Sequence, residues 1–178
     1  MNLHPSAIKV RAIIEKNLGS TEFLKLTDDL MKDPVSIEGL VELVSSDDKY
    51  PYPQYASHLL LHVSWKNYNL IEPYYEKVVD CVLTTVNPSL KRNLLGVVNC
   101  FSLKEYKEGD LLDWLFSAIS NPASKPGLLN YSVRKLAQYI QKYPELRQEV
   151  ESALELREEM DMNPGLVAWS RTVLKKKK

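Results

Sequence analysis

The sequence predicts an all-α protein built from stacked helix pairs, and three observations lead to this fold class. Alternating polar and apolar runs of the kind that predicts strands are nearly absent. Apolar residues instead recur at helical spacing, and prolines and glycines separate these stretches. The third observation is a recurring proline, at Pro53, Pro88, Pro126 and Pro164, with intervals of 35, 38 and 38 residues. An interval of this size is typical of a repeat made of two helices.

The composition is that of one folded domain, which we expect to span residues 1–178. Hydrophobic residues make up 44% of the 178 residues and charged residues 26%, as in globular proteins. The 23 basic and 23 acidic residues give a net charge of zero, which excludes a strongly basic nucleic-acid binder. The N-terminus lacks the apolar core of a signal peptide, and no apolar run is long enough to span a membrane. We therefore expect a cytoplasmic protein.

The N-terminal elements are predicted to shield one end of the core. A helix over 6–17 carries its apolar residues on one face, and a second helix, which Ser20 can cap, continues to Lys32. Residues 1–33 thus form two capping helices. Asp33 caps a third helix, with Pro34 in the first turn, where a missing N–H group has no consequence.

The repeats are predicted over 34–174, followed by a basic tail, Lys175–Lys178. Their helices are expected at 34–45, 53–67, 70–85, 88–102, 109–121, 126–143, 145–161 and 164–176. Each helix that begins with one of the four prolines carries an apolar stripe one face wide. The stripes comprise Ala56, Leu59, Leu60 and Val63; Leu90, Leu94, Val97, Val98 and Phe101; Leu129, Val133, Leu136, Ala137 and Ile140; and Leu166, Trp169 and Val173. No pair can bury its apolar face alone, so stacking supplies the core.

This arrangement resembles the HEAT-like and armadillo-type helical solenoids over about residues 34–178. The resemblance rests on the period, the helix pairing and the recurrent proline. It implies a right-handed α-α superhelix of about four helix pairs plus the two N-terminal helices. It also implies that the proline-led helices line a concave surface, which is where such proteins usually bind partners.

The candidate binding residues lie opposite the four apolar stripes. They are Tyr55, His58, His62 and Trp65; Arg92 and Asn99; Tyr131, Lys135 and Gln138; and Arg171. This set combines aromatic, imidazole, amide and cationic groups with no carboxylate, which favours a protein or peptide partner and is compatible with an acidic one. A solvated face that happens to lack acids is the alternative. Because Arg92 and Lys135 are both expected opposite core stripes, changing both to glutamate is expected to leave the fold intact.

Two alternative functions rest on part of the same set. The architecture resembles the HEAT-like alkylpurine DNA glycosylases, and Trp65, Tyr131, Arg92, Lys135 and Arg171 could supply part of a nucleic-acid face. The predicted groove lacks the acidic catalytic residue of those enzymes, and the net charge is zero where phosphate contacts should dominate affinity. The remoter alternative is a metal site at His58 and His62, which lacks a third ligand and the glutamate of the HExxH motif.

Other features of the sequence are expected to be structural. Cys81 and Cys100 lie in apolar helical stretches and are expected to be reduced core thiols, with a disulfide or a metal pair as the alternative. The segment DDKYPYPQY, residues 47–55, forms either a lip of the groove or only a cap on a helix end. No GxGxxG, GxxxxGK[ST] or GxSxG motif is present. The sequence therefore predicts a non-catalytic binding scaffold without a cofactor.

Overall fold

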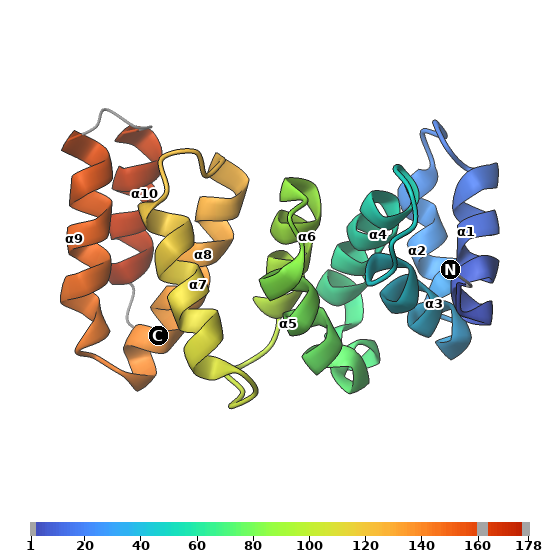
Figure 1. The fold of residues 1–178 in the computed structure, drawn as a ribbon, viewed down its shortest axis with the longest axis horizontal. Coiled ribbons are helices and arrows are strands. Elements are labelled where there is room, and N and C mark those ends of the chain that lie inside the picture. The colour runs from blue at the N-terminus through green and yellow to red at the C-terminus, as the bar shows by residue number, and fades with distance from the viewer. Residues whose placement is uncertain (1–2, 160–163, 176–178) are drawn as a thin grey trace. The chain divides into compact units, whose positions relative to one another are not determined.

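The computed structural model describes residues 3–159 and 164–175, and every regular element in these ranges is helical (Figure 1). The predicted all-α fold class is confirmed. The contacts within the chain define two compact units, Met1–Phe101 and Ser102–Lys178. The predicted right-handed turn of the stack and the single domain stay predictions.

Unit 1 contains six α-helices and three short 3₁₀ helices. In chain order they are α1 (Pro5–Lys16), η1 (Phe23–Lys25), α2 (Leu26–Leu30), α3 (Pro34–Val44), α4 (Tyr52–Asn67), η2 (Tyr68–Leu70), η3 (Glu72–Tyr74), α5 (Tyr75–Thr84) and α6 (Pro88–Val98). Helix α3 pairs with α4 and α5 pairs with α6, while α4 also packs along α6 (Figure 1). Helix α1 covers α3, and α2 packs on α4.

The repeat is visible in the bonds between α4 and α6. The Asn93 side-chain amide donates to Ser57 Oγ at 2.9 Å, and the Cys100 thiol donates to Ser64 Oγ at 3.4 Å. Both pairs are separated by 36 residues, so the two helices run parallel and are offset by one repeat. This agrees with the proline interval in the sequence.

Capping residues fix where two of the proline-led helices begin. Asp33 Oδ1 accepts a hydrogen bond from the Val35 amide, as predicted, and Asn87 Oδ1 accepts from the amides of Ser89 and Leu90. The proline at the first position of each helix has no N–H that would need a partner.

A glycine sets the distance between α1 and α3. A Cβ atom at Gly39 would lie 2.4 Å from the Ser6 carbonyl oxygen and 2.6 Å from Val10 Cγ2. Because real Cβ contacts are essentially never this short, α1 reaches its position only because residue 39 has no side chain.

Unit 2 contains two helix pairs, formed by α7 (Glu108–Ser120), α8 (Pro126–Lys142), α9 (Leu146–Glu159) and α10 (Pro164–Lys175) (Figure 1). Helices α7 and α9 pack together, as do α8 and α10. The buried Arg157 side chain of α9 donates to the carbonyl oxygens of Ile119 and Asn121 at 3.0 and 2.6 Å, which satisfies the C-terminal end of α7.

Three predicted helices differ from the structure. The helix expected at 88–102 ends at Val98. The helix expected from Ser20 to Lys32 consists of a 3₁₀ turn and the short α2, and Ser20 Oγ accepts from the Glu22 amide before the turn. The Thr27 hydroxyl there donates to the Leu24 carbonyl oxygen, which competes with regular helix bonding. The helix expected at 70–85 starts only at Tyr75, because Pro73 lacks the N–H that a continuous helix requires.

The predicted apolar stripes form the cores of the two units. The first and second stripes are fully buried, and so is the third except for the half-buried Ala137. The predicted fourth stripe is shifted by one residue from the side of the helix that is buried. Trp169 and Val173 are half-buried, while Ser170 and Leu174 of the same helix are buried. The Leu166 side chain and residues 176–178 of the basic tail lie outside the described part of the chain.

Candidate functional site

The first group of candidate residues forms a row along α4. The His58 and His62 rings lie 4.8 Å apart between centroids, and their Nε2 atoms are at the hydrogen-bonding distance of 3.2 Å. The His62 ring in turn contacts the Trp65 ring edge to face at 4.7 Å. Trp65 is 55% exposed, whereas both histidines are half-buried. The i, i+4, i+7 spacing has therefore placed three rings in contact on one helix face.

Arg92 of α6 lies beside this row, and its position is fixed by a buried polar chain. Its Nε and Nη2 atoms donate to Asn93 Oδ1 at 3.1 and 3.0 Å, and Asn93 itself donates to Ser57 of α4. Asn93 is 3% exposed and Ser57 is fully buried, while Arg92 is exposed. No carboxylate among the residues described in the structure pairs with this guanidinium.

The electrostatic environment keeps the two imidazoles uncharged. Burial lowers the pKa of His58, and the Arg92 charge lowers it further. Burial likewise lowers the pKa of His62, with smaller contributions from His58 and Lys66. Their hydrogen bond requires one ring nitrogen to donate and the other to accept, which only an unprotonated acceptor ring can do. The nearby Lys66 ammonium is paired with Asp28 of α2 at 2.6 Å.

The remaining predicted residues of unit 1 have local roles. Tyr55 packs edge to face on the buried Phe23, with ring centroids 4.8 Å apart. The Asn99 side-chain amide donates to the Leu95 carbonyl oxygen at 2.9 Å, one turn back along α6. Asn99 thus stabilises the end of its own helix.

The four predicted residues of unit 2 lie on α8 and α10. Tyr131, Gln138 and Arg171 are half-buried. Lys135 is 0% exposed, and its Nζ donates to Gln138 Oε1 at 3.0 Å. The prediction that Lys135 lies on an open face is therefore wrong, and the expectation that glutamate would be tolerated there loses its premise. The buried residues of helix α8, at positions 129, 132, 133, 135, 136, 139 and 140, span about 160° of its circumference at 100° per residue, and Lys135 lies at the edge of this buried arc.

Two residues beside the row on α4 were not predicted. Asn93 holds Arg92, and its signal in the sequence is a polar residue at the helical spacing of the apolar stripe, three residues after Leu90 and four before Val97. Tyr68, just after α4, is 44% exposed, and its ring contacts Phe101 at 5.4 Å. Tyr68 lies three residues after Trp65, so helical spacing could have found it.

The segment over 47–55 is attached to α1. Arg11 of α1 pairs with Asp48 at 3.3 Å, and its guanidinium lies 4.4 Å from the centre of the Tyr52 ring. These contacts agree with the interpretation of the segment as a cap on the start of α4.

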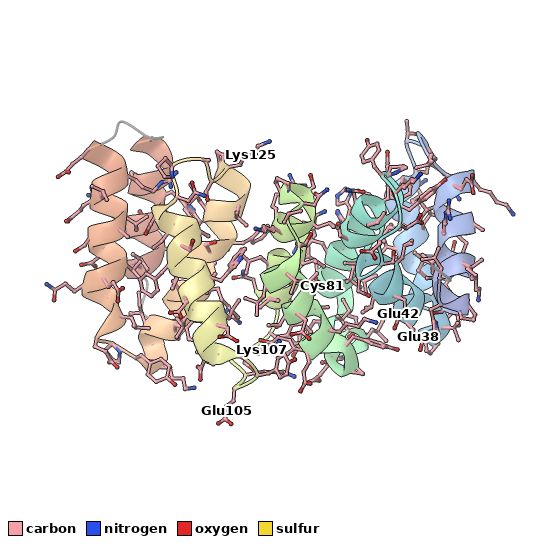
Figure 2. The ribbon with its side chains drawn as sticks, viewed as in Figure 1. Glu38, Glu42, Cys81, Glu105, Lys107 and Lys125 are labelled. Atoms are coloured by element: carbon pink, nitrogen blue, oxygen red, sulfur yellow. The ribbon has the colours of Figure 1, made fainter. Side chains whose placement is uncertain are left out.

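The cysteines and the acidic residues of α3 and α5 form no second site. Figure 2 labels Glu38 and Glu42 on α3 and Cys81 on α5. Both cysteines are free and half-buried, and burial raises the pKa of the Cys81 thiol, which keeps it protonated. In the described ranges, no three or more His, Cys, Asp and Glu side chains gather as metal ligands would. A lone pair of imidazoles falls short of the three protein ligands of a catalytic zinc site.

The stacked helix pairs and their constant offset define the chain as a helical repeat protein. A family model described as HEAT repeat domain matches residues 10–177, and the chain belongs to this family. The match extends across both units. Neither the comparison with curated proteins nor the comparison with solved structures gave a match. None of the helices in the described ranges is long and apolar enough to cross a membrane.

Proposed function

We propose that this HEAT repeat protein is a non-catalytic scaffold that binds a protein or peptide through unit 1. The proposed contact is the α4–α6 surface, defined by His58, His62, Trp65 and Arg92. The observation that carries the proposal is an exposed tryptophan in contact with His62, which is itself paired with His58, beside an arginine that its own helix holds in place. Membership of the HEAT repeat family supports a scaffold.

These residue types suit protein recognition. Tryptophan and arginine are enriched among the few side chains that contribute most of the binding energy in interfaces. The contacts of Trp65 with His62 and of Arg92 with Asn93 restrict both side chains before any partner arrives. Less conformational entropy is then lost on binding, which favours affinity.

The charge of the surface favours an acidic protein partner over a nucleic acid. Arg92 has no carboxylate partner in the described part of the chain, while Lys66 is already paired with Asp28. Affinity for duplex DNA depends on neutralising several phosphates, and one open cation does not provide this. The cytoplasmic location expected from the sequence stays a prediction.

The test is affinity capture with the tagged full chain and two variants. Trp65→Ala removes the exposed ring, and Leu156→Ala removes a side chain of similar exposure, 50%, from α9 of unit 2. We expect a partner that the wild type and Leu156→Ala retain and that Trp65→Ala loses, with unchanged melting temperatures. Equal retention by all three proteins, or no partner above the tag alone, would show that this surface is not the binding site.

A further inference from the structure

We infer that the α4–α6 surface binds a carboxylate of an acidic peptide at Arg92, and that the His58–His62 pair takes up a proton as it does so. This inference rests on the proposed function and names the chemistry of the partner. It makes the affinity of the scaffold dependent on pH in the range where histidine titrates.

The Arg92 guanidinium is oriented for a ligand. Of its five N–H groups, Nε and one on Nη2 are used by Asn93, and the others have no acceptor in the described part of the chain. Asn93 is fixed by its bond to the buried Ser57, so the guanidinium cannot easily turn away. The free N–H groups can therefore bind an oxyanion without first breaking an ion pair.

The number of cations selects a carboxylate over a phosphate. A phosphoryl group carries nearly two charges and is typically recognised by clusters of arginine. Of the two described cations that act on the imidazoles, Lys66 is already paired with Asp28, whereas Arg92 has no carboxylate partner in the described part of the chain. One guanidinium matches the single charge of a carboxylate, and Trp65 offers apolar contact for the neighbouring residues of the peptide.

The two imidazoles respond to the charge at Arg92. The charged groups that act on them are Arg92 and Lys66, both positive. Three charged groups on the other elements packed against α4 are in ion pairs: Asp28 of α2 with Lys66, Arg11 of α1 with Asp48, and Glu42 of α3 with Lys77 of α5. With no ligand, a proton on either ring is opposed by these cations, while one proton shared by the pair still allows the hydrogen bond between the rings.

A bound carboxylate removes part of the electrostatic opposition to a proton on the two rings. It neutralises the Arg92 charge that disfavours a proton on His58, and it adds a negative charge near both rings. Binding therefore raises the pKa of the pair, and by linkage a lower pH strengthens binding. The loss of a charge-assisted hydrogen bond at Arg92 should weaken the complex about tenfold or more.

The probe is a fluorescein-labelled twelve-residue peptide of alternating glutamate and leucine, with a glutamine-for-glutamate peptide as its control. Anisotropy titrations use the full chain at pH 7.5 and 5.5, where free glutamate remains mostly ionised. The variants are Arg92→Gln, the double variant His58→Gln/His62→Gln, and Arg134→Gln. Arg134 is the matched control because it is an exposed arginine held by an amide oxygen, that of Asn130, on the proline-led helix α8.

We expect the wild type and Arg134→Gln to bind the acidic peptide, and to bind it at least threefold more tightly at pH 5.5 than at pH 7.5. Arg92→Gln should weaken binding about tenfold at pH 7.5, and the double histidine variant should lose the dependence on pH. Equal affinity for the acidic and glutamine peptides, equal loss in both arginine variants, or a pH dependence that survives without the histidines would overturn the inference. Any of these three results can occur while the affinity capture still yields a partner that the wild type retains and Trp65→Ala loses. In that case only the inference fails, and the proposed scaffold function stands.

Discussion

The close contact of α1 and α3 at Gly39 gives the sharpest test of the fold of unit 1. In Gly39→Ala, the new methyl group would lie 2.4 Å from the Ser6 carbonyl oxygen, about 1 Å closer than ordinary van der Waals contact allows. The obstructing atom belongs to the backbone, so a change of rotamer cannot relieve the clash. Helix α1 must move, which loosens the fully buried side chains of Ala7, Val10 and Ile14.

The expected effect follows from two opposing terms. Overpacking of this kind costs about 1–3 kcal/mol, while alanine gains about 1 kcal/mol over glycine in a helix interior. The clash involves three atoms under 3 Å, so we place the overpacking term at the upper end, about 3 kcal/mol, and expect a net loss of about 2 kcal/mol. For a chain of this length, that lowers the melting temperature by about 4–8 °C.

The matched control is Gly109→Ala in the first turn of α7, where a new Cβ has no atom within 4 Å. It should leave the protein at least as stable as the wild type, because only the flexibility of the unfolded chain changes. Thermal melts followed by far-UV circular dichroism measure both variants. A Gly39→Ala protein as stable as Gly109→Ala would refute the argument that this glycine sets the distance between α1 and α3.

Three further predictions concern single residues. Arg157→Met removes two hydrogen bonds to buried carbonyl groups and should lower stability by about 2–3 kcal/mol in a thermal melt, whereas Lys32→Met, at an exposed pair, should change nothing measurable. Lys107 has a φ of 47°, in the left-handed region that glycine adopts without steric cost. Lys107→Gly should therefore raise the free energy of unfolding by about 0.5–1 kcal/mol. A lower melting temperature would contradict this. Hydrogen bonds from Lys9 and Ser36 lower the pKa of Asp33 from 3.8 to about 2. Below pH 4 the unfolded chain therefore binds more protons at this residue than the folded chain does. The free energy of unfolding should fall as the pH is lowered from about 4 to 2. Melts over this range should show a weaker pH dependence in Asp33→Asn than in the wild type.

Much of the α4–α6 surface could be predicted, because it depends on helical spacing alone. His58, His62 and Trp65 are close in sequence and on one helix, so their contact follows from 3.6 residues per turn. Arg92 was predicted on the same surface, but the reason for its fixed position was not. The chain from Arg92 through Asn93 to Ser57 joins two helices, and no local pattern relates residues 36 positions apart.

Lys135 shows the opposite case. Its offset from Pro126 equals that of His62 from Pro53, so the repeat predicts the same exposure for both. His62 is half-buried and Lys135 is fully buried, because the surroundings of α4 and α8 differ although their sequences have the same period. Repetition in the sequence specifies the direction of a side chain on its helix and does not specify what covers it.

The sequence by itself determined the class of the fold, the helix pairs, the proline at the start of alternate helices and most of the buried stripes. Each of these depends on interactions within a few residues or on the apolar period of one helix. Only the tertiary structure decided the close approach of α1 at Gly39, the cap that Arg157 places on α7, and the exposure of the candidate residues. These features depend on which distant segments meet, and that is set by packing of the whole unit rather than by any local preference.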